Sequence, residues 1–338
     1  MQGRPTLADV ARAAGVSTGA VSLILRESGR FSESTRQRVK EAARRLDYRP
    51  NPVLSSYKTG KFRSKRATTA LPLAFVFRGG GPCPDSTRER AEELGYRLEN
   101  HELEEGEDPR RLGDILYARG VRGILLGQLY GCRSLPDLGW ERFACVCVSR
   151  PFFQVPFDVI RHRIVEDFLH AFEQARERGY RRIGFDVQIH RSWGQDHPDD
   201  RARYAAALYC QEQLPEKDRL PIHRSRASEN ETFREWIREH RPDAVVGGMG
   251  HRRRDIEAVG LKVPDEVGFV ALIVHGSEPG SSETGFLATG ANESLRAVEV
   301  LDQCIRRNLF GPRPDPMEHL VARRWREGAT LPGRRNRR

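Results

Sequence analysis

Apolar residues near the start of the chain recur at the period of one helix face. Residues 7, 10, 11 and 14 are Leu, Val, Ala and Ala, which is the i, i+3, i+4, i+7 spacing of an amphipathic helix. Thr6 and Asp9 form a capping-box-like start, and Gly15 supplies the permissive backbone on which the helix ends. Eight residues are too few for an isolated helix, so this segment needs a partner.

A second helical pattern follows at once. Ser17 is a favourable N-cap, and the apolar residues 21, 24 and 25 give the second helix an inward face. Two short helices joined by a turn that contains glycine predict a helix-turn-helix, although any αα-hairpin would also fit these residues alone. A helix that approaches base edges in the major groove needs small outward residues near its N-terminus. Those residues are Thr18, Gly19 and Ser22.

A third helix is predicted from an N-cap at Ser32 to about Leu46, and its outer faces are basic. Residues 1–66 hold fifteen Lys and Arg against five Asp and Glu, an excess of ten that equals the net charge of the whole chain. The positive charge therefore coincides with the helix-turn-helix and indicates a surface for phosphates. A second basic run, residues 334–338, is interpreted as a disordered tail.

From Leu71 onward, buried strands alternate with helices, a pattern that predicts parallel sheets covered by helices. The expected strands are residues 71–77, 96–103, 124–126, 143–148, 183–187, 222–226, 244–246 and 268–274, and the expected helices are residues 87–94, 109–118, 164–178, 200–213, 232–239 and 294–307. We expect two Rossmann-like lobes with a ligand cleft at the carboxyl ends of their strands. The fold class is thus an all-α helix-turn-helix headpiece plus an α/β core.

Composition narrows the chemistry of the chain. The sequence has no signal peptide and no run of about eighteen apolar residues, which favours a cytoplasmic protein without a membrane partner. Six cysteines form no CxxC pair and predict buried free thiols. The glycine run at 79–81 lacks the spacing and the Lys-Ser/Thr of a P-loop, and the histidines of the core stand in no Ser/Asp or metal constellation. We expect no enzyme, no cofactor and no metal site.

Longer stretches of the sequence resemble one family. The DNA-binding headpiece and hinge of the lactose-repressor (LacI/GalR-type) family of bacterial transcription regulators are similar to TLADVARAAGVSTGAVSLIL, SESTRQRVKEAARRLDYRPNP and the residues up to Gly60. The effector-binding core of that family, which is periplasmic-binding-protein-like, is similar to RERAEELGYRLENHEL, ILYARGVRGILLG, EQARERGYRRIGF, LKVPDEVGFVAL and WREGATL. The resemblance implies a homodimeric repressor of pseudo-palindromic double-stranded operator DNA, controlled by a small-molecule effector bound between the lobes.

The resemblance also implies domain boundaries and DNA-binding residues. The headpiece would use residues 1–50, the hinge helix and linker 51–70, lobe 1 about 71–160 and 292–320, lobe 2 about 161–291 and 321–331, and the basic tail 332–338. Leu23 stands where many members place an Arg that grips guanine, so base preference does not carry over from the family. The expected DNA-binding residues are Thr6, Leu7, Ser17, Thr18, Gly19, Ser22, Leu23, Arg26, Arg30, Asn51, Leu54, Tyr57 and Lys58.

The effector site departs from the family pattern. Ile273 stands where the family usually has Asp, and Gly248 lies in a segment without the usual Asn-Asp, which argues against a neutral sugar. Arg203 occupies a position that resembles the family's effector-contacting Arg. The expected effector-binding residues are Gly79, Gly80, Arg150, Arg203, Gly248, Ile273 and His275.

Two alternatives to an effector-controlled repressor stay open at this point. In the first, the core of a DNA-binding regulator has lost its ligand and serves as a dimerisation or protein-docking module. In the second, which belongs to another class, a small-molecule-processing enzyme or carrier has an appended DNA-binding headpiece. Turnover of a bound metabolite would support the second alternative, and no residue pattern in the sequence indicates it.

We predict that Leu54→Ser combined with Tyr57→Ser lowers specific DNA affinity and DNA bending. Residues 52–59 are too few for a stable isolated helix, and the resemblance implies that an apolar residue of this segment wedges into the minor groove. Nonspecific affinity should change little, because Lys and Arg carry it. A gel-shift bending assay measures both effects, and unchanged bending in the double mutant would remove the wedge hypothesis.

Overall fold

The chain divides into two compact units, Met1–Thr69 and Ala70–Arg338. This computed structural model describes residues 7–25, 31–46, 70–192, 195–226, 229–274, 282–288 and 290–334. The predicted hinge segment lies outside these residues. Within the described part of the chain, no single helix is long and apolar enough to span a membrane, although the bent pair Ala8–Ala14 and Thr18–Leu25 passes the same test by length and composition.

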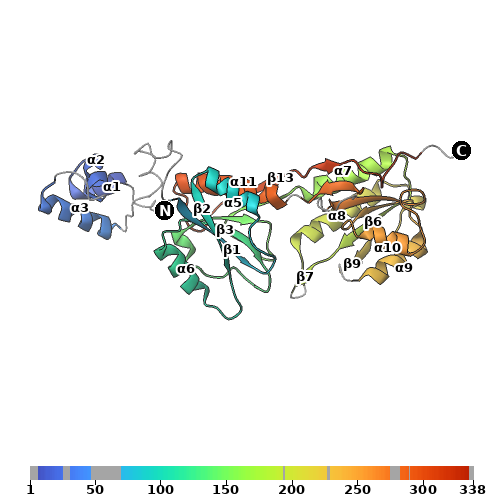
Figure 1. Cartoon of the computed structure of the whole chain (residues 1–338), viewed down its shortest axis with the longest axis horizontal. Coiled ribbons are helices and arrows are strands. Elements are labelled where there is room, and N and C mark those ends of the chain that lie inside the picture. The colour runs from blue at the N-terminus through green and yellow to red at the C-terminus, as the bar shows by residue number, and fades with distance from the viewer. Residues whose placement is uncertain are drawn as a thin grey trace. The chain divides into compact units, whose positions relative to one another are not determined.

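The described residues of the N-terminal unit form three helices that the sequence predicts: α1 (Leu7–Ala14), α2 (Thr18–Leu25) and α3 (Glu33–Arg45) (Figure 1). Gly15 ends α1 with a φ of 64°, a left-handed conformation that favours glycine. The three inward faces share one small core, because none of these helices is long enough to stand alone. Its buried residues are Val10, Ala11, Ala14, Val21, Ile24, Val39, Ala42 and Ala43.

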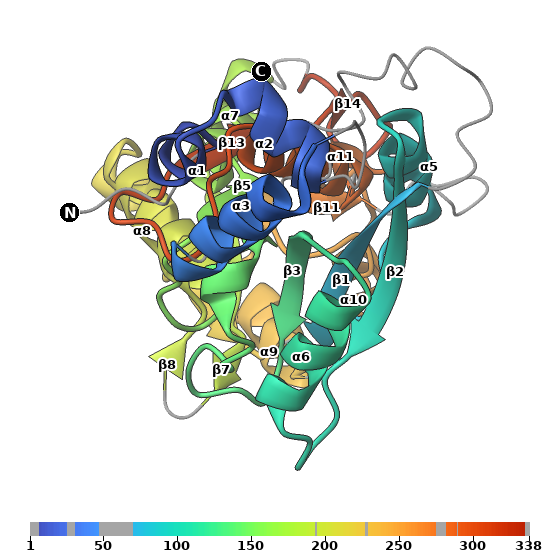
Figure 2. The same cartoon turned by 90° about the vertical axis from the view of Figure 1, so that its left-hand side faces the viewer.

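The described residues of the C-terminal unit form two six-stranded sheets, and we call the part built on the first sheet lobe 1. Its strands run parallel in the order β13-β5-β4-β3-β1-β2, and β1 lies between β2 and β3 in Figure 2. The strands are β1 (Leu71–Arg78), β2 (Tyr96–Glu102), β3 (Gly123–Leu129), β4 (Ala144–Val148), β5 (Asp158–His162) and β13 (Glu318–Val321). Its helices are α5 (Asp85–Glu93), α6 (Pro109–Ala118) and α11 (Gly290–Arg306), with the 3₁₀ turn η2 (Trp140–Arg142).

Side-chain alternation along β3 explains how helices cover both faces of the lobe 1 sheet. A Cβ at Gly123 would meet Leu301 and Ile305 of α11 at 3.1 and 2.7 Å, so α11 packs closely on that face. Ile124 points to the other face and joins the buried cluster that contains Leu116 of α6. The result is a three-layer α/β/α lobe, as the alternating pattern predicts.

We call the part built on the second sheet lobe 2. Its order is β14-β12-β11-β10-β6-β9, with β14 antiparallel and the other strands parallel. The strands are β6 (Ile183–Gln188), β9 (His223–Ser225), β10 (Ala244–Gly247), β11 (Gly268–Val274), β12 (Thr284–Leu287) and β14 (Trp325–Arg326), and a small hairpin pairs β7 (Arg191–Ser192) with β8 (Gln195–Asp196). The helices are α7 (Ile164–Glu177), α8 (Pro198–Glu212), α9 (Asn230–His240) and α10 (Arg252–Ala258), with the 3₁₀ turn η3 (Glu216–Asp218).

The chain passes between the two lobes three times, after β5, after β12 and after β13. The strands and helices predicted by pattern lack several short elements: β5, β7, β8, β12, β13, β14 and α10. Edge strand β13 has the sequence EHLV, with alternately exposed residues, which gives little apolar signal. Arg334, the first residue of the predicted basic run, is ordered by contacts with lobe 2, because it donates to Asp243 at 3.0 Å and lies over the ring of Tyr180.

Lobe 2 encloses a fully buried guanidinium. Arg252, the first residue of α10, is 0% exposed and donates through Nε to Asp186 Oδ2 at 2.9 Å. Asp186 also accepts from His223 Nδ1 at 2.7 Å, and Phe233 covers the guanidinium at 4.5 Å. Removing the Arg252 and Asp186 charges from water costs free energy, and this cost is offset only because the two groups pair with each other and are hydrogen-bonded.

We predict that Asp186→Asn lowers the free energy of unfolding of lobe 2 by about 3–5 kcal/mol, because it leaves the buried Arg252 charge poorly compensated. Urea unfolding followed by Trp fluorescence measures the change. The control is Asp243→Asn, which removes a more exposed pair with Arg334 and should cost about 1 kcal/mol or less. Equal costs for the two variants would contradict the prediction.

Candidate functional site

The N-terminal unit presents the start of α2 as an open surface. The Oγ of Ser17 accepts a hydrogen bond from the backbone N–H of Ala20 at 3.1 Å, so Ser17 caps this helix as predicted. Ser17, Thr18 and Gly19 are exposed, and Leu23, one turn further along, is 43% exposed. The bend from α1 to α2 is 99°, within the roughly 90–120° of helix-turn-helix units.

Helix α3 contributes the basic side chains of this unit. Ser32 caps it, with its Oγ accepting from Thr35 N at 3.3 Å. The apolar stripe at Val39, Ala42 and Ala43 is buried, so the charged residues face outward. The exposed basic residues of α3 are Arg38, Lys40, Arg44 and Arg45.

Most of the expected DNA-binding residues are not described by the structure. Ser17, Thr18, Gly19 and Leu23 are described and lie on the open surface of α2. The backbones of Leu7 and Ser22 lie in α1 and α2, and their side chains lie outside the described atoms. The remaining residues lie outside the described ranges: Thr6, Arg26, Arg30, Asn51, Leu54, Tyr57 and Lys58.

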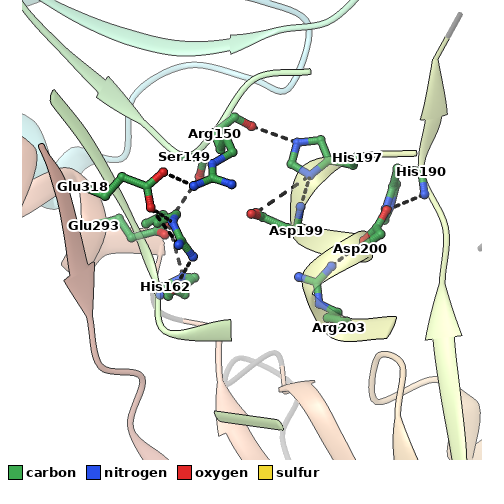
Figure 3. Close-up of polar contacts among 11 residues, drawn as sticks. Ser149, Arg150, His162, His190, His197, Asp199, Asp200, Arg203, Glu293 and Glu318 are labelled. Atoms are coloured by element: carbon green, nitrogen blue, oxygen red, sulfur yellow. Dashed lines mark hydrogen bonds and ion pairs between the residues drawn. The ribbon is translucent and has the colours of Figure 1, made fainter. Parts of the chain in front are cut away.

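In the C-terminal unit, polar side chains gather where the carboxyl ends of the two parallel sheets approach each other (Figure 3). We call this group the interlobe cluster. Lobe 1 contributes the ends of β4 and β5 and the first turn of α11, and lobe 2 contributes the segment after β6 and the N-terminal part of α8. Its members are Ser149, His162, His190, His197, Asp199, Asp200, Arg203 and Glu293.

The lobe 1 half of the interlobe cluster is built on Glu293. This carboxyl group is 6% exposed, lies 3.2 Å from His162 Nε2 and accepts a long hydrogen bond from Ser149 Oγ at 3.5 Å. Burial raises the pKa of Glu293 to about 7, with Asp199 adding to the rise. Burial lowers the pKa of His162 to about 4, and the charge of Arg323 lowers it further.

The lobe 2 half is built on Asp200, in the first turn of α8. It is 2% exposed and accepts from the backbone N of His190 at 2.6 Å, from His190 Nδ1 at 3.1 Å and from Arg203. Burial alone would raise the pKa of Asp200, but the bonds from His190 and the Arg203 charge lower it. The same bond raises the pKa of His190.

His197 connects the two halves. Its Nδ1 accepts from Asp199 N at 3.2 Å, which caps α8, and its Nε2 donates to the carbonyl oxygen of Arg150 in lobe 1 at 2.8 Å. The ring also meets Phe152 edge-on at 4.8 Å between centroids. His197 is not among the site residues predicted from the sequence, although the pair His197-Pro198, an N-cap before a first-turn proline, could have indicated it.

The two candidate effector arginines lie in different places. Arg203 lies within the interlobe cluster, where it bonds Asp200. The side chain of Arg150 instead pairs with Glu318 on β13, and only its backbone carbonyl reaches His197. The structure therefore brings Arg203, but not the Arg150 side chain, to the cluster.

The candidate glycines pack against neighbouring side chains. Gly79 and Gly80 have φ values of 65° and 77°, and a Cβ on either would lie 3.1 Å from the ring of Tyr130. A Cβ on Gly248 would lie 2.7 Å from Asp186 Oδ2, so this glycine makes room for the buried ion pair of lobe 2. Close packing by a neighbouring group accounts for glycine at these positions.

Of the last two candidates, Ile273 lies near the end of β11. Ile273 is partly buried, and its carbonyl oxygen accepts from Gly250 N at 3.2 Å. His275 lies outside the described residues.

Three buried polar atoms near the interlobe cluster have no hydrogen-bond partner among the described residues. They are Nδ1 of His162, Oδ1 of Asp199 and Nε2 of Gln188, the last residue of β6. Buried polar atoms are normally paired, so these three can bind a polar ligand or water. The described residues include no group of His, Cys, Asp and Glu that could hold a metal, and their cysteines are free thiols.

Comparisons with known proteins agree with this architecture. Residues 6–51 match the family model "Bacterial regulatory proteins, lacI family". A curated relative, the HTH-type transcriptional regulator DegA of Bacillus subtilis (strain 168), is 29% identical over 182 residues, which are 51% of this chain and 51% of DegA. The match thus spans about half the length of this relative, whose name is that of a regulator, in agreement with the prediction that the chain is not an enzyme.

Two solved structures share the fold over nearly the whole chain. The lac repressor dimer bound to operator and the anti-inducer ONPF has a TM-score of 0.57 at 18% identity and covers 98% of this chain and 100% of its own. The transcriptional regulator CelR in complex with cellobiose has a TM-score of 0.56 at 18% identity and covers 97% of this chain and 100% of its own. The predicted fold class, a helix-turn-helix headpiece plus a two-lobed α/β core, is confirmed, and residues 6–51 match the lacI family of bacterial regulatory proteins.

Proposed function

We propose that this protein is a homodimeric, sequence-specific repressor that binds a pseudo-palindromic operator and is controlled by a small molecule bound between its lobes. The observation that carries the DNA-binding part is the open N-terminal surface of α2, with Ser17, Thr18 and Gly19 exposed on a unit that contains the whole positive charge excess of the chain. Small exposed residues let a helix approach base edges, and the surrounding Lys and Arg bind phosphates.

Symmetry and one structure of the same fold support the proposed dimer and operator. A single headpiece has one short recognition helix, which gives little specificity, whereas two headpieces related by a two-fold axis contact two half-sites. The lac repressor, which shares the fold, was solved as a dimer bound to operator. We extend the same assembly to this chain as part of the proposal, together with a headpiece over residues 1–50 and a hinge over 51–70.

The interlobe cluster supports the effector part of the proposal. A ligand among Glu293, Asp200 and Arg203 would contact side chains of both lobes, so its affinity would depend on how the lobes are arranged. That dependence is what an effector needs in order to shift a conformational equilibrium. The unpaired atoms of His162, Asp199 and Gln188 favour a ligand that offers both donors and acceptors.

A core without a ligand is the second candidate function. It is favoured by the absence of the family's usual polar residues near Gly248 and at Ile273. In that case the core would serve for dimerisation or protein docking alone. Selection of bound DNA from a random pool, with and without a metabolite extract, separates the two candidates, because only an effector-controlled repressor changes its DNA affinity with the extract.

We predict that Thr18→Asp abolishes enrichment of a specific sequence in that selection. A carboxylate at the exposed start of α2 repels DNA, while the helix itself stays folded, because a negative charge favours its N-terminus. Gln213→Glu, at the far end of α8, changes the net charge equally and should retain the wild-type sequence preference.

DNA affinity of the wild type should also fall as salt rises, because each neutralised phosphate releases counterions. A fragment that starts at Thr68 should lose DNA binding, since it lacks the charge excess. Full DNA affinity in that fragment, or an unchanged preference in Thr18→Asp, would contradict the DNA-binding proposal.

Glu293 and His162 lead to a pH prediction of their own. Folding raises the pKa of Glu293 from 4.5 to about 7, so the folded state binds this proton more tightly than the unfolded state. The contribution of Glu293 to stability therefore falls as pH rises from 4.5 to 7. The folded state lowers the pKa of His162 from 6.5 to about 4, so its contribution rises as pH increases from 4 to 6.5. The two slopes have opposite sign and largely cancel in the wild type.

We therefore predict that Glu293→Gln gains stability relative to wild type as pH rises from 4.5 to 7, whereas His162→Gln loses stability relative to wild type as pH rises from 4 to 6.5. Each difference should be of order 1–3 kcal/mol. Urea midpoints measured across this pH range test the prediction. Parallel pH profiles for both variants and the wild type would show that neither group is perturbed by folding.

A further inference from the structure

A pocket of about 840 Å³ lies beside β5 and β13, outside the interlobe cluster. Lobe 1 supplies the loop from Arg150 to Phe157 and the start of β13, and lobe 2 supplies two residues from the first turns of α8. The volume falls in the roughly 300–1,000 Å³ range of small-molecule sites. The lining residues are Arg133, Arg150, Phe152, Phe153, Gln154, Val155, Phe157, Val159, Pro198, Arg201, Pro316, Met317 and Glu318.

This pocket and the interlobe cluster lie on opposite faces of the lobe 1 sheet. Val159 lines the pocket and belongs to the buried cluster beneath α6. Arg161 points to the same face and pairs with Glu318, which also lines the pocket. Next along the strand, His162 points to the other face, where it meets Glu293 of α11. A ligand in the pocket would therefore occupy a site separate from the proposed effector cleft.

The charged groups of the pocket are mainly positive. Three guanidinium groups, those of Arg133, Arg150 and Arg201, line it against one carboxylate, Glu318. That carboxylate is already shared, since it pairs with both Arg150 and Arg161. Burial and the nearby positive charges of Arg161 and Arg201 lower the pKa of Arg150. An anion in the pocket would reduce the repulsion among these positive charges.

The remaining wall is apolar and partly aromatic. Phe153 and Val155 are partly buried against the lobe 1 core, and Phe157 is fully buried behind them. Phe152 packs on His197, the residue that bonds the two lobes. Such a wall accepts the flat apolar body of a ligand, whereas the guanidinium groups bind its charged end.

We infer that this pocket binds a small aromatic acid, with its carboxylate or phosphate between Arg150 and Arg201 and its ring against Phe153. Arg150 belongs to lobe 1 and Arg201 to lobe 2, so the acid would hold the described arrangement of the lobes. Binding of this kind stabilises whichever arrangement presents both arginines. The acid would thus act as a second input to the core, independent of any effector in the interlobe cluster.

Calorimetric titration of the full chain with benzoate, phenylphosphate, inorganic phosphate and benzyl alcohol tests the inference. We expect benzoate or phenylphosphate to bind in the millimolar range or tighter, and inorganic phosphate and benzyl alcohol to bind much more weakly, because each lacks one half of the ligand. Arg201→Gln should weaken binding of the acid about tenfold through loss of a charge-assisted contact. Arg201 is exposed, so its replacement should leave the fold intact.

Arg111→Gln is the matched control, since this exposed arginine of α6 does not line the pocket. It should bind the acid as the wild type does, and Phe153→Leu should bind it more weakly through loss of the aromatic surface. Thermal melts of all three variants establish that they are folded. Equal affinity in Arg201→Gln and Arg111→Gln, or no binding of either acid at millimolar concentration, would overturn the inference.

Discussion

The hydrogen bond from His197 Nε2 to the carbonyl oxygen of Arg150 joins the two lobes at the point on which both proposed ligand sites depend. The ring of His197 caps α8 through its other nitrogen, so it is held on lobe 2 while it binds lobe 1. Burial lowers the pKa of His197, which favours the neutral ring with one donor and one acceptor that this geometry requires. A charged imidazole would lose the contact with Asp199 N, because it has no acceptor.

Charge burial explains why polar residues gather beside this contact. Parallel strands end at one edge of each sheet, so polar groups at these ends meet where the lobes approach. Asp200 remains ionised there because His190 and Arg203 bond it, whereas burial outweighs the contacts of Glu293 with His162 and Ser149, so Glu293 holds its proton more tightly. The lobe 2 half is therefore a satisfied ion pair, and the lobe 1 half has unpaired capacity for a ligand.

Much of the fold followed from local pattern, and most of the site did not. Helix α6 was predicted at its observed bounds because Asp108 caps it and Pro109 begins it. Strand β5, with the sequence DVIRH, was missed because its only apolar residues, Val159 and Ile160, are flanked by polar residues and give too short an apolar signal. Ser149 and Glu293 are 144 residues apart in the chain, so no spacing rule could have paired them. Arg203 was predicted as an effector-binding residue from the resemblance to the lactose-repressor family, and no residue pattern indicated it.

Two ligand sites on opposite faces of one sheet would act on the same equilibrium. Each site contains groups of both lobes, so each ligand would favour the arrangement in which its own contacts are complete. The two sites could be coupled without a chain of contacts through the sheet, because both ligands would change the same arrangement of the lobes. Its sign would depend on whether the two sets of contacts are complete in the same arrangement. The Arg150 backbone bonds His197 beside the interlobe cluster, and the Arg150 side chain lines the second pocket. One residue therefore contacts both proposed ligand sites.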